Sequence, residues 1–355
     1  MHRSVQFISF LISVSMVSCF KPDDPSIIDP FDSFVTPNAV FIINEGNFGW
    51  GNGSLTYFSY DSVKIYNDIF SKINQRPLGD VPFSMNITGD LAYIVVNNSG
   101  KIEVINRRTL KSETTITGFK SPRYLSVVNP NKAYVSSIYS DSVTIVNLIR
   151  NTISGYININ NASESIIITG KKAFIANWVG GNEVFVINTD TDEVIDSVEV
   201  GPEPESMILD KNGLIWVLCN GGWTRENFAE LAVINPLSHE IVKRFIFPSK
   251  MNSPLNLQTD NDGDTLFYLD SGIRRMSIAE TELPSDPFIG ETGYLFYKLG
   301  INPKNGDVFV TDAVDYQQNG YVRIYSNKGV FIRSYQAGVI PGSIFFIVPS
   351  SHETE

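Results

Sequence analysis

The sequence predicts an all-β protein, a seven-bladed β-propeller built from four-stranded antiparallel blades. The first observation is a pattern of short runs that recurs between Pro122 and Val200 with a period of about 41 residues, as in propellers and solenoids. The second is the composition of these runs: Val, Ile, Tyr and Phe separated by Asn, Asp, Gly and Ser, without helical spacing. The third is that each copy holds four runs, which is the unit of a propeller blade.

The chain begins with a segment typical of secretion, which we assign as a signal peptide over residues 1–18. Its apolar part, Phe7 to Val17, is too short to cross a bilayer. Met16-Val17-Ser18-Cys19 resembles a bacterial lipoprotein signal, which implies that Cys19 is lipidated and anchors the protein to a membrane. An ordinary cleaved signal peptide is the alternative.

Residues 19–38 carry several prolines among acidic and small residues, so we expect a lipidated tether outside the fold. Lys21-Pro22-Asp23-Asp24 is similar to the acidic tethers of lipoproteins that gut Bacteroidetes export to the outer face of the outer membrane. This resemblance implies a lipid-anchored protein of the outer membrane that faces the cell exterior.

The propeller itself is expected over residues 39–348, followed by a tail at 349–355. Seven copies are counted from the aromatic residue of each second strand: Phe41, Tyr93, Tyr134, Phe174, Trp216, Phe267 and Phe309. Ala39–Asn44 aligns with these second strands, so the first blade lacks its innermost strand. The final apolar run, Pro341 to Val348, matches a first strand and is predicted to close the ring by pairing with that blade.

Composition excludes some classes of function. The 355-residue chain has a formal net charge of −11 and no run of Lys or Arg, which argues against a nucleic-acid partner. Of its two cysteines, Cys219 follows an apolar run and is predicted to be a buried free thiol.

The connections after the second strands are longest in blades one, five and seven, and insertions in a repeat protein map to its working face. These loops combine aromatic residues with amides and glycines, which suit a neutral ligand rich in amides or hydroxyls. Folding of the tryptophans back onto the blade ends is the alternative. The candidate ligand contacts are Asn44, Asn47, Trp50, Asn97, Asn98, Tyr139, Asn177, Trp178, Asn220, Trp223, Tyr316 and Gln317.

Catalytic motifs are scarce. The three histidines, His2, His239 and His352, form no triad or metal spacing, and we expect His239 to be a solvated turn residue. We expect no metal site, and we interpret Asp260–Asp264 as a hairpin turn and not as a calcium loop. Carboxylates that could serve a calcium-dependent enzyme are Glu45, Glu164, Glu205, Asp270, Asp312 and Asp315.

The repeats, notably Ala133 to Ser136, Val143 to Asn147 and Val194 to Pro202, resemble the YVTN (YncE-like) family of seven-bladed propellers. With the lipoprotein signal and the aromatic, amide-rich loops, the chain also looks like the surface-exposed cobalamin-binding lipoproteins of gut Bacteroidetes. This resemblance implies a non-enzymatic protein without a resident cofactor, which captures vitamin B12 or a related corrinoid and passes it to a TonB-dependent transporter. A glycan receptor, a calcium-dependent hydrolase or lyase, and a protein–protein scaffold remain alternatives.

Overall fold

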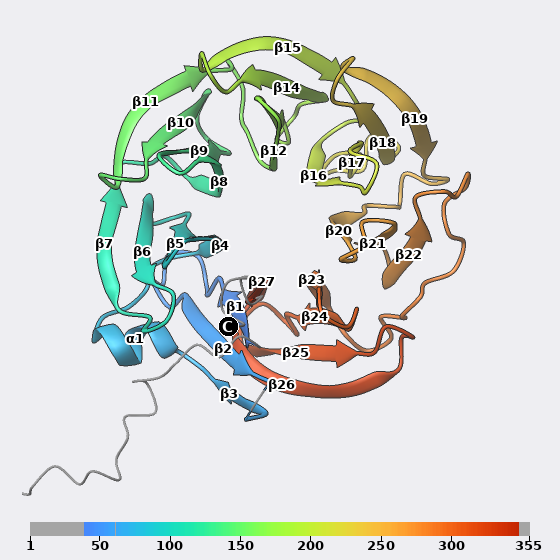
Figure 1. Ribbon diagram of the computed structural model, residues 1–355. Helices are drawn as coiled ribbons and strands as arrows, with labels where there is room; N and C mark the ends of the chain where they lie inside the picture. The colour runs from blue at the N-terminus through green and yellow to red at the C-terminus, as the bar shows by residue number, and fades with distance from the viewer. Residues whose placement is uncertain (1–38, 61, 348–355) are drawn as a thin grey trace, which may run out of the picture.

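The computed structural model describes residues 39–60 and 62–347, in which seven β-sheets stand around a common axis (Figure 1). The signal peptide, the lipidated Cys19, the tether and the tail therefore lie outside the described residues. In chain order the elements are β1 (Ala39–Asn44), β2 (Ser54–Ser59), β3 (Lys64–Tyr66), α1 (Ile69–Asn74), β4 (Pro82–Thr88), β5 (Leu91–Val96), β6 (Lys101–Asn106), β7 (Ser112–Thr117), β8 (Pro122–Asn129), β9 (Lys132–Ser137), β10 (Ser142–Asn147), β11 (Thr152–Asn158), β12 (Ile166–Thr169), β13 (Lys172–Ala176), β14 (Glu183–Asn188), β15 (Glu193–Glu199), β16 (Pro204–Leu209), β17 (Ile215–Cys219), β18 (Glu230–Asn235), β19 (Glu240–Ile246), β20 (Leu255–Thr259), β21 (Thr265–Leu269), β22 (Ile273–Ser277), β23 (Phe296–Ile301), β24 (Val308–Asp312), β25 (Asn319–Tyr325), β26 (Phe331–Val339) and β27 (Pro341–Ile347).

The predicted seven-bladed propeller is confirmed, and so is its closure. The first blade has the strand order β27-β1-β2-β3, so the last strand of the chain is the innermost strand of the first blade. β27 pairs antiparallel with β1, with Phe345 opposite Phe41 and Ile347 opposite Ala39. The two ends of the propeller are thus joined by backbone hydrogen bonds, which removes two open sheet edges.

One blade departs from the prediction of four strands. The sixth sheet has three strands, β20-β21-β22, and the place of an outer strand is taken by a single bridge between Ile273 and Ile289. The segment after β22 contains Pro284 and Pro287, which have no amide hydrogen to donate to a strand ladder. A full edge strand therefore does not form there.

Each second strand is buried on both faces, which explains why it reads as a continuous apolar run. The seven aromatic residues used to count the blades all lie on second strands and are all buried. Phe41 packs between the first and second blades, while its neighbours Val40 and Ile42 pack between the seventh and the first. The alternation of side chains along a strand thus feeds two different core layers.

The hydrophobic core is a series of seven clusters, one at each junction between neighbouring blades. The cluster that unites Phe309 and Val322 with Phe58 joins the last blade to the first and completes the ring. Helix α1 adds Ile69 and Phe70 to the cluster between the first two blades.

Asparagines at the ends of the third strands shape the turns that follow. The Oδ1 atom of Asn147 accepts hydrogen bonds from the backbone amides of Ile149 and Arg150, and Asn106 and Asn188 do the same in their blades. This side-chain bonding favours a tight turn, so the recurring Asn of the sequence repeat has a structural cause.

The two ends of the ring carry different connections. The loops between second and third strands bond to the connections between blades, as when the amides of Glu45 and Asn97 donate to the carbonyls of Ile340 and Val81. We call this end the rim face. The opposite end, which carries the other hairpin turns, is called the turn face. The predicted hairpin at Asp260–Asp264 is confirmed: it connects β20 to β21 on the turn face.

Candidate functional site

The three long loops of the sequence all belong to the rim face. They connect β1 to β2, β17 to β18 and β24 to β25. Trp50 is 78% exposed and Trp223 87% exposed, and Tyr316 is also exposed. The predicted alternative, that these tryptophans fold back onto the blades, therefore does not apply to Trp50 or Trp223. Large exposed aromatic side chains on one face are a common feature of interaction sites.

The long loops of the first and seventh blades are held against each other. The Nδ2 atom of Asn47 donates a hydrogen bond of 2.9 Å to the backbone carbonyl of Tyr316. The Oδ1 atom of Asn47 accepts one from Asn52, within the same loop. Asn47 therefore fixes the position of two aromatic loops relative to each other.

Other exposed candidates lie on shorter loops of the same face or at its margin. Tyr139 is 64% exposed on the third blade, next to a cavity of about 190 Å³ that Ser137 and Ser140 help to line. Asn98 donates a hydrogen bond of 2.5 Å to Asp80. Gln317 lies in the seventh-blade loop, where its backbone amide donates to Asp315.

Three of the predicted amides are buried and form hydrogen bonds within the chain. This finding corrects their prediction as ligand contacts. Asn44 donates to the hydroxyls of Ser54 and Thr56, and Asn97 donates to Ser121 and to the carbonyl of Pro122. Asn220 accepts from the backbone amide of Gly222. Each lies at or just after the end of a second strand, where its amide holds the adjoining loop instead of facing solvent.

Asn177 and Trp178, on the fourth blade, differ from these three amides because each has a buried polar atom without a hydrogen-bond partner in the described chain. The Oδ1 atom of Asn177 and the Nε1 atom of Trp178 are buried and have no hydrogen-bond partner among the described residues. Two consecutive residues thus hold a buried acceptor and a buried donor without such partners, although buried polar groups normally have one. The guanidinium of Arg123 lies 5.4 Å from the centre of the Trp178 ring.

Beneath the rim face, near the axis, the first strands and the residues next to them bring together a group of charged and aromatic side chains. We call it the axial cluster: Glu45, Phe83, Arg123, Glu164, Glu205, Tyr297 and Lys298. Arg123 donates to both carboxylate oxygens of Glu164 at 2.8–3.1 Å, and Lys298 lies 3.3 Å from Glu205. The Arg123 guanidinium also covers the Phe83 ring, 3.4 Å from its centre.

Burial dominates the electrostatics of this cluster. Desolvation raises the pKa of Glu45 and of Glu164, although the nearby cations Lys298 and Arg123 act in the opposite direction. Burial likewise raises the pKa of Tyr297 well above its ordinary value, and Glu45 adds to that effect. Tyr297 therefore stays a neutral hydrogen-bond donor toward Glu45.

The acidic members of the axial cluster were predicted from the sequence as candidate carboxylates, whereas Phe83, Arg123, Tyr297 and Lys298 were not. A signal was present, because Phe83, Arg123 and Glu205 each directly follow a proline at the start of a first strand. Residues in that position share one level of the ring. No local pattern, however, showed which of them would meet across the axis.

The other carboxylates considered for calcium accept hydrogen bonds from neighbouring protein groups. Asp270 accepts from Asn252 and Asp312 from Arg323, while Asp315 holds the backbone of its own turn. Across residues 39–60 and 62–347 no group of three or more His, Cys, Asp or Glu side chains is arranged to hold a metal ion. Within the same residues no helix has the length and apolar character needed to span a membrane.

Two further sequence predictions concern single residues. Cys219 is a buried free thiol as predicted, and burial raises its pKa well above the ordinary value. The prediction that His239 is solvated is wrong. Its side chain is 14% exposed because its ring bridges to the fourth blade, with Nδ1 2.6 Å from Asp196 and Nε2 2.7 Å from Lys172.

The fold and its loops define this protein as a seven-bladed β-propeller with an aromatic rim face. The chain belongs to the family described as a domain of unknown function, DUF5074, which matches residues 38–341. A search of curated proteins found no match.

Several solved structures share the fold. A quinonprotein alcohol dehydrogenase-like protein of Bacteroides thetaiotaomicron is 13% identical, with a TM-score of 0.70 over 88% of this chain and 78% of the other. Hydrazine synthase of Kuenenia stuttgartiensis is 14% identical, with a TM-score of 0.60 over 74% and 88% of the two chains. The dihydro-heme d1 dehydrogenase NirN, in complex with DHE, is 10% identical, with a TM-score of 0.56 over 88% and 76%. At these identities the similarity establishes the propeller alone.

Proposed function

We propose that this protein is a non-catalytic ligand-binding protein that holds cobalamin or a related corrinoid on its rim face. The observation that carries the proposal is the grouping of the three long loops on one face, where Trp50, Trp223 and Tyr316 are all exposed. Such aromatic surface is costly to expose in water unless something covers it.

The chemistry of the rim fits a broad ligand that carries amides at its edge. Flat aromatic side chains offer large contact areas to a planar ring system. Asn47, Asn98 and Gln317 are the candidate amides that remain exposed or partly bonded at the surface, and each can donate and accept. The unpartnered Oδ1 of Asn177 and Nε1 of Trp178 are an acceptor and a donor that would complement an amide of the ligand.

The charges of the axial cluster favour a binding role over calcium-dependent catalysis. Glu164 and Glu205 are paired with Arg123 and Lys298, and Glu45 accepts a hydrogen bond from Tyr297. A calcium ion needs several carboxylate or carbonyl oxygens free to coordinate it. These carboxylates already have cationic or hydroxyl partners, so the proposal assigns them to stabilising the ring.

We further propose that the lipid anchor at Cys19 holds the propeller on the outer membrane and that the ligand passes to a TonB-dependent transporter. This part follows from the lipoprotein signal and the acidic tether of the sequence. A ligand held on exposed loops, and not enclosed in the ring, is accessible to a receiving protein.

Isothermal titration calorimetry with cyanocobalamin tests the proposal. We expect saturable one-to-one binding at micromolar protein, unchanged by a chelator. Binding of an oligosaccharide to the rim without any response to cyanocobalamin would establish the glycan alternative instead. Hydrolytic or lyase activity that a chelator abolishes and calcium restores would establish the enzyme. Absence of all three responses would contradict the proposal and would favour the alternative of a protein–protein scaffold.

A further inference from the structure

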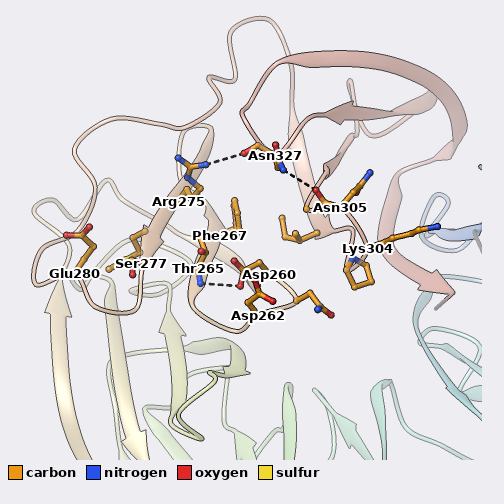
Figure 2. Close-up of a pocket in the computed structure, with 15 residues that line it drawn as sticks. Asp260, Asp262, Thr265, Phe267, Arg275, Ser277, Glu280, Lys304, Asn305 and Asn327 are labelled. Carbon is orange, nitrogen blue, oxygen red and sulfur yellow. Dashed lines mark hydrogen bonds between the residues drawn. The ribbon is translucent and has the colours of Figure 1, made fainter. Parts of the chain in front are cut away.

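A second recess of the molecule lies on the turn face, between the sixth and seventh blades and far from the rim loops. It is a cleft of about 690 Å³, within the range of roughly 300–1,000 Å³ typical of small-molecule sites (Figure 2). The hairpin Asp260–Asp264 forms one wall together with Ser277 and Glu280, and the turns around Asn305 and Asn327 form the other.

The walls of the cleft are fixed by hydrogen bonds. The backbone amides of Asp264 and Thr265 donate to Oδ1 of Asp260, which locks the hairpin. Within the opposite wall, Nδ2 of Asn327 donates to the carbonyl of Asn305 at 3.2 Å. Arg275 spans from β22 of the sixth blade to the carbonyl of Asn327 in the seventh, as Figure 2 shows. The cleft is therefore preorganised, which lowers the entropic cost of binding.

The floor of the cleft is apolar. Phe267, Met276 and Ile301 line it, and all three are buried members of the core between neighbouring blades. A recess with an apolar floor and polar groups at its edge has the features typical of a site for a small organic molecule.

The polar groups at the edge of this cleft limit the chemistry of its ligand. Asp262 and Glu280 are exposed carboxylates that accept only, and neither side chain has a hydrogen-bond or ion-pair partner among the described residues. Arg275 and Lys304 are donors only. An anionic ligand would meet the carboxylates, and a cationic one would meet the guanidinium and the ammonium. Hydroxyl groups donate and accept without charge, so they can satisfy both kinds of group at once.

We propose that this cleft is a binding site for a small neutral saccharide, separate from the ligand site of the rim face. Vicinal sugar hydroxyls bond to Asp262 and Glu280 on one side and to Arg275 on the other, while the carbon face of a sugar ring lies on the apolar floor. The inference does not depend on the function proposed for the rim.

Saturation-transfer NMR tests the site with a set of four neutral disaccharides: maltose, cellobiose, lactose and sucrose. At least one is expected to bind the full-length protein, and calorimetry then gives its affinity. Glu280→Ala and Asp262→Ala should each weaken that binding about tenfold, because each removes a charge-assisted hydrogen bond. Glu282→Ala is the matched control. It removes the same kind of side chain from the same segment, two residues away, where the side chain lines a different cavity.

Both cleft substitutions are at exposed positions, and unchanged thermal unfolding of each variant verifies the fold. Cyanocobalamin titrations of the same variants keep this test apart from that of the rim, since neither residue lies on the rim face. The proposal is overturned if no disaccharide of the set binds. It is equally overturned if binding survives both substitutions, or if glycine and glutamate bind the cleft in place of the sugars.

Discussion

The hydroxyl of Tyr297 donates a hydrogen bond of 3.0 Å to Oε1 of Glu45, across the junction where the seventh blade meets the first. Tyr297 belongs to β23 and Glu45 directly follows β1, so the bond lies beside the strand pairing that closes the ring. It also lies under Tyr316, whose ring packs edge-on against Tyr297 with centroids 5.7 Å apart. Ring closure, the axial cluster and the rim face thus meet at one place.

Glu45→Gln should stabilise the protein at alkaline pH. Burial raises the pKa of Glu45 above its usual 4.5, so the folded state holds a proton that the unfolded state has released, and stability falls as pH rises through that window. Glutamine keeps an acceptor for Tyr297 and has no charge to desolvate. We expect the midpoint of thermal unfolding at pH 8 to rise by about 1–4 °C.

At pH 4 and below both side chains are neutral, so the difference between wild type and Glu45→Gln should disappear. A variant that is less stable than wild type at pH 8 would contradict the assignment. Calorimetric melting curves at pH 4, 6 and 8 provide the measurement.

Arg123→Met should destabilise the fold strongly, by about 3–5 kcal/mol, because Glu164 would be left buried without its cation. The double variant Arg123→Met/Glu164→Gln should lose less than the single one, since no buried charge remains unpaired. Denaturant unfolding measures both. Lys171→Met, which breaks the exposed pair with Asp190, is the control and should leave the midpoint unchanged. Equal losses in the single and double variants would count against a buried charge as the cause.

Truncation at the C-terminus should separate the closing strand from the tail. A chain that stops after Gly338 lacks β27 and leaves β1 with an open edge and the core between the seventh and first blades incomplete. We expect it to lose cooperative thermal unfolding. A chain that stops after Ile347 retains β27 and should melt like the full-length protein. Identical melting of the two truncations would refute closure by β27.

Trp50→Ala and Trp223→Ala should each weaken cyanocobalamin binding by tenfold or more, because exposed tryptophans at the centre of a contact commonly dominate its affinity. Leu237→Ala removes a side chain that is 85% exposed on the turn face and should leave affinity unchanged. If the leucine variant binds as weakly as the tryptophan variants, the ligand does not bind at the rim.

Cys219 should be unreactive toward a thiol reagent in the folded protein. Its side chain is fully buried and burial raises its pKa, so little thiolate forms at neutral pH. In a chain that carries Cys19→Ser it is the sole cysteine. Ellman's reagent should then titrate no thiol before denaturation and one afterwards, and rapid reaction of the native protein would show that the blade opens locally.

Much of this architecture could be predicted from the sequence because its determinants are local and repeated. Buried second strands required continuous apolar runs with an aromatic residue, and the third strands ended in turn-forming asparagines such as Asn147. The position of Ala39–Asn44 in that repeat implied that an innermost strand had to come from the other end of the chain. Loop lengths likewise predicted the three loops that expose Trp50, Trp223 and Tyr316.

The tertiary structure alone decided how distant side chains meet. Arg123 and Glu164 are 41 residues apart in sequence, and Glu205 and Lys298 are 93 apart, so no local pattern could pair them. It also decided that Asn44 is buried while Trp50, six positions later, is exposed, since burial depends on what neighbouring blades cover. The cleft between the sixth and seventh blades has the same origin, because its walls come from both blades. Periodicity specifies a blade, whereas contacts between blades determine which groups are left to bind a ligand.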